Sequence, residues 1–247
     1  MSAVLPRSAM RRVTCADLRE LGAAYRVSLL YAAARCARET KLYLHWTAGH
    51  YGQFFADYHV QIDADGAVYI IGAGVLDEVL AATYLRNSGS VSIALLAACG
   101  ATTEDLGAEP PTAAQIESMA MATAALADGL WLTIDKARVM THGEAADNED
   151  GVRAHLPYGP RTTCERWDLE YLGTAESPAF APWAQDGSRG GDVLRGKAQY
   201  YRTLRQLYPP PCDTGEGDRL RWKGRHDRHR FSRVRAARST SPTQPPA

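Results

Sequence analysis

The stretch "KLYLHWTAGHYGQFFADYHVQIDADGAVYIIG", Lys41–Gly72, decides the fold class because it contains the strongest β-strand signals in the chain. It opens with "KLYLHW", a mostly apolar, β-forming run in which His45 is followed by small and polar residues. Farther along, two β-forming runs flank Asp65 and Gly66, a pair that favours a hairpin because the turn requires positive φ. The stretch therefore predicts a strand followed by a β-hairpin.

The flanking segments add helices and more strands. "SVSIALLAA", Ser90–Ala98, is apolar nearly throughout, which is typical of a central strand, and "ARVMTH" predicts a second strand that ends in a histidine, His142. Thr112 and Gln115 have the spacing of a helix-starting capping box. Helices are expected over Ala16–Arg38, Glu109–Trp131 and Asp192–Leu207. The pattern predicts an α/β fold: a central mixed β-sheet flanked by helices.

Composition limits the class of protein. Hydrophobic residues make up 45% of the 247 residues and charged residues 23%, which is enough apolar material for a sizeable core. The formal net charge is zero, so the overall charge points to no partner. The five cysteines are scattered without a CxxC pair, which argues against a disulfide framework and for a reducing compartment. The first residues lack the apolar run of a signal peptide, so we expect synthesis in the cytoplasm.

We divide the chain into an N-terminal helical extension (1–38), a main domain (39–208) and a C-terminal tail (209–247). The tail is rich in Pro, Gly and Arg and poor in aliphatic residues, so we expect it to be disordered. Its arginines, concentrated between Asp218 and Arg238, indicate either a solubilising appendage or an electrostatic contact with anionic cell-wall polymer, acidic lipid or nucleic acid.

Two histidines share a context that fits either a pair of metal ligands or two structural histidines at strand ends. His45 and His142 each end an apolar, strand-like run and precede small residues. If the two strands are neighbours, both imidazoles face one cleft, as a catalytic zinc site requires; a third protein ligand and an open position complete such a site. Spacing alone leaves Asp147, Cys164 and Asp168 as candidates for the third ligand.

Six ordered segments carry a resemblance to a known family. They are "HWTAGHYG", "DYHVQIDADGAVY", "NSGSVSIALLAA", "PPTAAQIESMA", "VMTHGEAA" and "ERWDLEYL". In this order and spacing they resemble the zinc-dependent N-acetylmuramoyl-L-alanine amidases, a superfamily that includes phage lysozyme-type amidases and peptidoglycan recognition proteins. The resemblance covers about Lys41–Leu172, and it implies the mixed sheet flanked by helices of that fold.

The resemblance also implies the roles of five residues. His45 and His142 match the first two zinc ligands, and Asp168, two residues after Arg166, matches the third better than Cys164 does. Tyr58, directly before a histidine, matches a tyrosine that assists proton transfer, and Arg166 matches the cation that stabilises the oxyanion. Bound Zn²⁺ would lower the pKa of its water to about 7 and so supply hydroxide at neutral pH.

The sequence departs from the family at two positions. Ala94 stands where many members have a glutamate at the end of a strand, which leaves the general base unidentified. Leu169 and Glu170 replace the proline and glycine that usually follow the third ligand, which puts the geometry around Asp168 in doubt.

Four further polar residues are weaker candidates. His59 follows Tyr58 and faces the opposite way in a strand, so we expect it to be a core histidine. His50, in a loop, and Asn87 and Ser88, before a strand, are candidates for contact with the glycan or the stem peptide.

The resemblance implies a monomeric zinc amidase that cleaves peptidoglycan, as a phage or prophage endolysin that acts on the cell wall after release. The alternative is a peptidoglycan-binding recognition module without catalysis. We expect no specific nucleic-acid binding, because the sequence before the tail has no helix-turn-helix, zinc-finger or RNP pattern.

Overall fold

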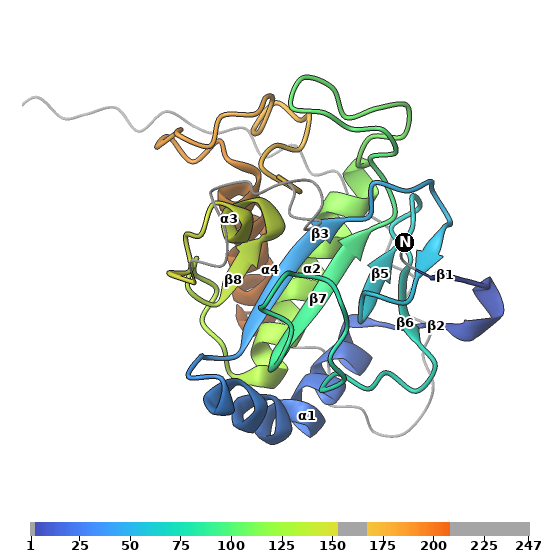
Figure 1. The fold of residues 1–247 in the computed structure, drawn as a ribbon, viewed down its shortest axis with the longest axis vertical. Helices are drawn as coiled ribbons and strands as arrows, with labels where there is room; N and C mark the ends of the chain where they lie inside the picture. Colours follow the sequence, from blue (N-terminus) through green and yellow to red (C-terminus); the bar gives the residue numbers. More distant parts are fainter. Residues whose placement is uncertain (1–2, 153–166, 208–247) are drawn as a thin grey trace, which may run out of the picture. The chain divides into compact units, whose positions relative to one another are not determined.

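The computed structural model describes residues 3–152 and 167–207 (Figure 1). The chain divides into two units, Met1–Pro209 and Pro210–Ala247, and the second lies outside the described residues together with the predicted tail. The strands are β1 Val4–Leu5, β2 Met10–Arg12, β3 Lys41–Trp46, β4 Phe54–Phe55, β5 Val60–Ile62, β6 Val68–Ile71, β7 Ser90–Leu95 and β8 Val139–Thr141. The helices are a 3₁₀ turn, Arg7–Ala9, and α1 Cys15–Arg35, α2 Ala113–Leu130, α3 His142–Ala146 and α4 Gly190–Leu207.

Six strands form one mixed sheet in the order β2-β6-β5-β7-β3-β8. Strands β5, β7, β3 and β8 are parallel to one another, whereas β6 pairs antiparallel with both β5 and β2. The predicted hairpin is confirmed: β5 and β6 flank a turn in which Gly66 has φ 80°. This mixed sheet with packed helices confirms the predicted α/β class.

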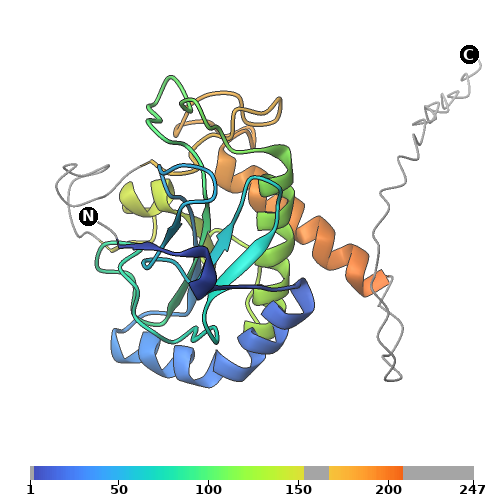
Figure 2. The ribbon, with the colours of Figure 1, turned by 90° about the vertical axis from the view of Figure 1, so that its right-hand side faces the viewer.

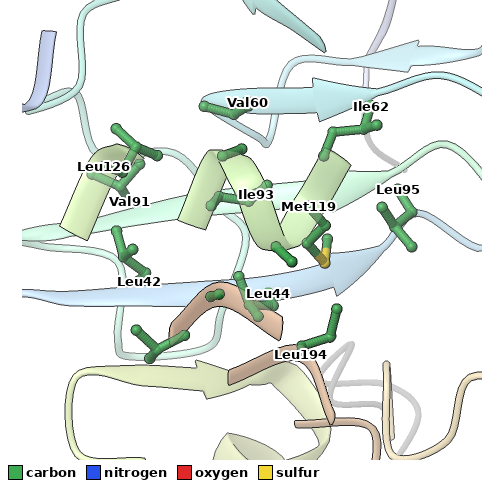
Figure 3. Packing of buried hydrophobic residues seen from close by; sticks show 14 of the residues in the cluster. Leu42, Leu44, Val60, Ile62, Val91, Ile93, Leu95, Met119, Leu126 and Leu194 are labelled. Atoms are coloured by element: carbon green, nitrogen blue, oxygen red, sulfur yellow. The ribbon is translucent and has the colours of Figure 1, made fainter. Parts of the chain in front are cut away.

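The two faces of the sheet have different residues because side chains alternate along each strand. One face is aliphatic and packs against α2 and α4 (Figure 3). Its labelled residues are Leu42, Leu44, Val60, Ile62, Val91, Ile93 and Leu95 from the strands and Met119, Leu126 and Leu194 from the helices. The alternate residues, which include His45, Ser92 and Ala94, are therefore directed to the other face. The hydrophobic core lies on one side of the sheet and the candidate site on the other.

Helix α2 begins as predicted, with Thr112 as N-cap and Gln115 completing the capping box. Helix α1 packs closely against α2 where Gly22 meets Gly129. This close approach requires glycine, because a Cβ on Gly129 would lie only 2.3 Å from the Arg19 carbonyl oxygen. Figure 2 shows α1, α2 and α4 together beside the sheet. No helix in the described ranges is long and apolar enough to span a bilayer.

The region before Lys41 contains two short strands as well as helix α1. Strand β2 pairs with β6 at the edge of the main sheet, and β1 pairs with β4. Leu18 and Leu29 of α1 are fully buried in the main core cluster. The N-terminal segment thus packs as part of the main unit, although the sequence indicated only helices there.

Candidate metal centre

His45 and His142 come together because their strands are parallel neighbours. Leu44 of β3 is in register with Thr141 of β8, so the next residue on each chain is one of the two histidines. Their ring centroids lie 4.7 Å apart, and both side chains are buried. The two strands are adjacent, as the site requires, although neither histidine is the last residue of its strand: β3 continues to Trp46, and His142 is the first residue of α3.

Asp168 completes a group that could hold a metal ion. Its Oδ2 lies 3.1 Å from His142 Nδ1 and 3.7 Å from His45 Nδ1, and one ligand atom from each residue falls within 4.8 Å of the others. Two nitrogens and an oxygen bound tetrahedrally to Zn²⁺ lie about 3.3 Å apart, a value between the two distances from Asp168. The donor types and these two separations therefore fit a metal ion, and three protein ligands would leave a fourth tetrahedral position for water or substrate.

A threonine that the sequence did not single out orients His45. Thr83 Oγ1 lies 3.2 Å from His45 Nε2, so the imidazole is held with its other nitrogen, Nδ1, directed at Asp168. Partners on the far nitrogen of a ligand histidine fix the ring and tune its basicity. Asn87 holds the threonine in turn, since its Oδ1 accepts from the Thr83 backbone N–H at 2.7 Å. Asn87, a candidate for substrate contact in the sequence, thus holds the backbone of the threonine that orients His45.

A buried ion pair anchors the loop that carries Thr83. Arg86 is fully buried and donates to both carboxylate oxygens of Asp150, at 2.6 and 3.1 Å, and to the Val152 carbonyl at 2.7 Å. Burial raises the pKa of Asp150, but the hydrogen bonds and charge of Arg86 outweigh it and hold that pKa below its ordinary value. The carboxylate is therefore charged at neutral pH, and the loop is tied to the segment after α3.

The start of α3 fixes the position of His142. Thr141 is the N-cap, and Glu144 completes a capping box with it. Arg195 of α4 then binds both carboxylate oxygens of Glu144 at 2.8 Å. Burial alone would lower the pKa of Arg195, but the hydrogen bonds and charge of Glu144 raise it, so the buried guanidinium stays charged. A sequence signal for this cap existed in "THGE", but its arginine partner is distant in the chain.

Asp168 is positioned through its backbone. The Gly143 N–H, next to His142, donates to the Asp168 carbonyl at 3.0 Å. Leu169, buried and at φ 62°, takes the left-handed conformation directly after Asp168. Arg189 binds both oxygens of the Glu170 carboxylate at 2.8 and 3.0 Å. Asp168 thus lies beside the two histidines with Leu169 and Glu170 in the positions where the resembled amidases usually have a proline and a glycine.

Tyr58 lies beside the group of His45, His142 and Asp168, which we call the metal group. Ala94 is the register neighbour of His45 in the sheet. The Tyr58 ring centroid is 5.2 Å from that of His45. Ala94 of β7 is in register with His45 on one side and with Gln61 on the other. The Gln61 amide is engaged in hydrogen bonds to the Phe55 backbone at 2.8 Å. Ala94 is thus directly beside His45 and offers no acid–base group.

The remaining candidates lie elsewhere or outside the described residues. Arg166 and Cys164 are in the undescribed segment, so their predicted roles stay predictions. Asp147 ends α3 and is not part of the metal group found among the described residues; burial and the charge of Glu149 raise its pKa. The Ser88 carbonyl accepts from Arg38 at 3.2 Å.

His59 and His50 have different surroundings. His59 is a buried core residue, as predicted: its Nδ1 accepts from the Ser92 N–H at 3.1 Å and its Nε2 donates to the Glu78 carbonyl at 3.0 Å. Burial lowers the pKa of His59 to about 4, so the ring is neutral. His50 is exposed in the loop after β3, where it contacts Glu109 and Cys99.

A scan against models of known protein families found no match, and neither did searches of curated proteins and of solved structures.

Proposed function

We propose that this protein is a zinc-dependent N-acetylmuramoyl-L-alanine amidase, which hydrolyses the amide between N-acetylmuramic acid and L-alanine in peptidoglycan. The observation that carries the proposal is the buried group of His45, His142 and Asp168, whose ligand atoms have separations suited to tetrahedral zinc. All three residues also stand at the ligand positions of the family that the sequence resembles.

The proposed division of roles follows from what each residue can reach. His45, His142 and Asp168 would hold Zn²⁺, which when bound lowers the pKa of a water molecule and polarises the scissile carbonyl. Tyr58, beside His45, would orient that water or help transfer its proton. Arg166, two residues before Asp168, would donate to the oxyanion. Thr83 and Asn87 hold the first ligand in place.

A specific observation favours a second candidate, a peptidoglycan-binding module without catalysis. Ala94 stands beside His45 at the position where many family members have a glutamate. A complete metal group without a carboxylate base at this position would bind the substrate without hydrolysing it rapidly. The two candidates predict the same metal content and differ in whether the amide is cleaved.

The test combines metal analysis with product analysis on the purified full-length chain. We expect about one zinc per chain and release of stem peptides with a free L-alanine amino group, identified by mass spectrometry. His142→Ala and Asp168→Asn should lose both, whereas Asp147→Asn, a neighbouring carboxylate outside the group, should keep both. Arg166→Ala should keep zinc and lower kcat by roughly 10²- to 10³-fold.

Each failure has a distinct meaning. Zinc binding and sedimentation with sacculi but no cleaved amide would support the binding module. Full metal content in His142→Ala would refute the metal group itself, and loss of zinc on Cys164→Ser alone would identify a different third ligand.

A further inference from the structure

Three side chains form a second cluster on the loops that follow β3 and β7. Cys99 Sγ lies 3.6 Å from His50 Nε2, and His50 Nδ1 lies 3.3 Å from Glu109 Oε2. The imidazole therefore stands between the thiol and the carboxylate, with one ring nitrogen directed at each. This linear order differs from a metal site, in which all ligand atoms converge on one point. It is the order of a nucleophile, a base and a group that orients the base.

The loops that carry the cluster are held by specific backbone contacts. A parallel β-bridge joins Gly49 to Ala98, the residues directly before His50 and Cys99. The Ala98 N–H donates to the Glu109 carbonyl at 2.7 Å, so the backbones next to the thiol and of the carboxylate residue are tied together. The Tyr51 N–H donates to Glu109 Oε2 at 2.8 Å, which fixes the oxygen that faces the imidazole.

Glycines make these close approaches possible. A Cβ on Gly49 would lie 2.8 Å from the Gln53 and Phe55 side chains. A Cβ on Gly107, at φ 78°, would lie 2.1 Å from the Cys99 carbonyl oxygen. The loops that carry His50 and Cys99 are therefore closely packed at Gly49 and Gly107, where a side chain would not fit.

The cluster is accessible to small molecules. The His50 side chain is 66% exposed and that of Glu109 is 28% exposed. Cys99 is a free, half-buried cysteine. Reagents in solution can therefore reach the sulfur, while the partly buried carboxylate keeps a fixed position behind the ring.

We propose that Cys99 is a reactive thiol that undergoes exchange with small disulfides. His50 takes the thiol proton, and Glu109 is a positioning residue that orients the imidazole. The Cys99 thiolate attacks one sulfur of R–S–S–R, a Cys99 S–S bond forms as the original S–S bond breaks, and the departing R–S⁻ takes the proton from His50 and leaves as R–SH. Cys99 is thereby oxidised to a mixed disulfide and one R–S group is reduced. The site is independent of the metal group and of the function proposed above.

The chain contains its own control, Cys36. This cysteine is exposed, whereas Cys99 is half-buried, and none of the described histidines lies in hydrogen-bond contact with it. Purified full-length protein is treated with 2,2′-dithiodipyridine, and modification of each cysteine over time is followed by peptide mass spectrometry. We expect Cys99 to react about 10-fold faster than Cys36 or more, because a positioned base accelerates proton removal.

Variants separate a chemical role from a structural one. His50→Gln should slow Cys99 to about the rate of Cys36, and Glu109→Gln, which can still accept from the Tyr51 N–H, should slow it less. The Cys36 rate in the same samples must stay unchanged, which shows that the fold is intact. The proposal is overturned if Cys99 reacts no faster than Cys36, or if His50→Gln leaves the Cys99 rate unchanged. If either variant changes the rates of both Cys99 and Cys36, the substitution has affected the fold. Glu109→Asp and His50→Asn then replace those variants, and the Cys99 rate relative to that of Cys36 decides.

Discussion

Replacing Thr83 with valine should weaken metal binding without touching a ligand. Thr83 is 1% exposed, and its hydroxyl lies 3.2 Å from His45 Nε2 in a fully buried environment. Valine has nearly the same shape, so the change removes the hydrogen bond and little else. Loss of such a partner typically lowers metal affinity by about 10- to 100-fold. This corresponds to about 1.4–2.7 kcal/mol of binding free energy.

The affinity is measured by competition between apoprotein and a chromophoric zinc chelator at neutral pH. Thr83→Ser, which keeps the hydroxyl, should bind zinc nearly as wild type does. The matched control is Thr123→Val in α2, because Thr123 is also 1% exposed and its hydroxyl has no hydrogen-bond partner in the described part of the chain. Wild-type affinity in Thr83→Val, or equal weakening in Thr123→Val, would refute the role assigned to this hydroxyl.

Three more predictions concern stability and the tail. Burial lowers the pKa of His59 from about 6.5 to about 4, so the folded state favours the neutral ring; the stability this provides is present above pH 6.5 and is lost as the pH falls toward 4. Urea titrations should show wild type losing about 2 kcal/mol more than His59→Gln between pH 7 and pH 5, and equal losses would contradict this. Gly129→Ala should lower the free energy of unfolding by about 1–3 kcal/mol, because its Cβ would meet the Arg19 carbonyl. The control is Gly196→Ala, on an exposed face of α4 with open space around it, which should be neutral or stabilising in the same titration. Truncation after Tyr208 should leave the melting temperature and muropeptide hydrolysis unchanged but weaken sedimentation with sacculi at low salt, since each arginine near an anionic surface contributes on the order of 1 kcal/mol; equal sedimentation of both chains would make the tail a passive appendage.

The features that sequence predicts well here are those encoded locally. Alternation and apolar runs placed β3, β5, β6, β7 and β8, and the Thr112 capping box placed the start of α2. The shared local context of His45 and His142 was also visible in the sequence, whereas their meeting depended on the parallel pairing of β3 with β8, which the structure supplies. These signals survive without tertiary context because they arise from side-chain periodicity and helix-terminus hydrogen bonding.

The features that sequence missed depend on distant partners. Strand β2 is only three residues long and gains its conformation from pairing with β6. Thr83 lies in a stretch with no periodicity, and its hydroxyl acquires a role only when the fold brings His45 to it. Arg86 and Arg195 resemble surface charges in the sequence, yet each is buried by a carboxylate far along the chain. Such contacts are properties of the folded chain and leave no local pattern.

The hydrogen bond from the Gly143 N–H to the Asp168 carbonyl has a consequence for how this site tolerates insertions and deletions. It joins the backbone beside His142 directly to that of Asp168. The separation of these two ligand positions in space therefore does not depend on the number of residues between them. Chain length between Val152 and Trp167 is therefore expected to change without moving either ligand, and a search pattern with a fixed interval between the two would miss proteins that share the site. The spacing that defines such a site is the one between the Asp168 carbonyl and the first turn of α3, measured in ångströms and not in residues.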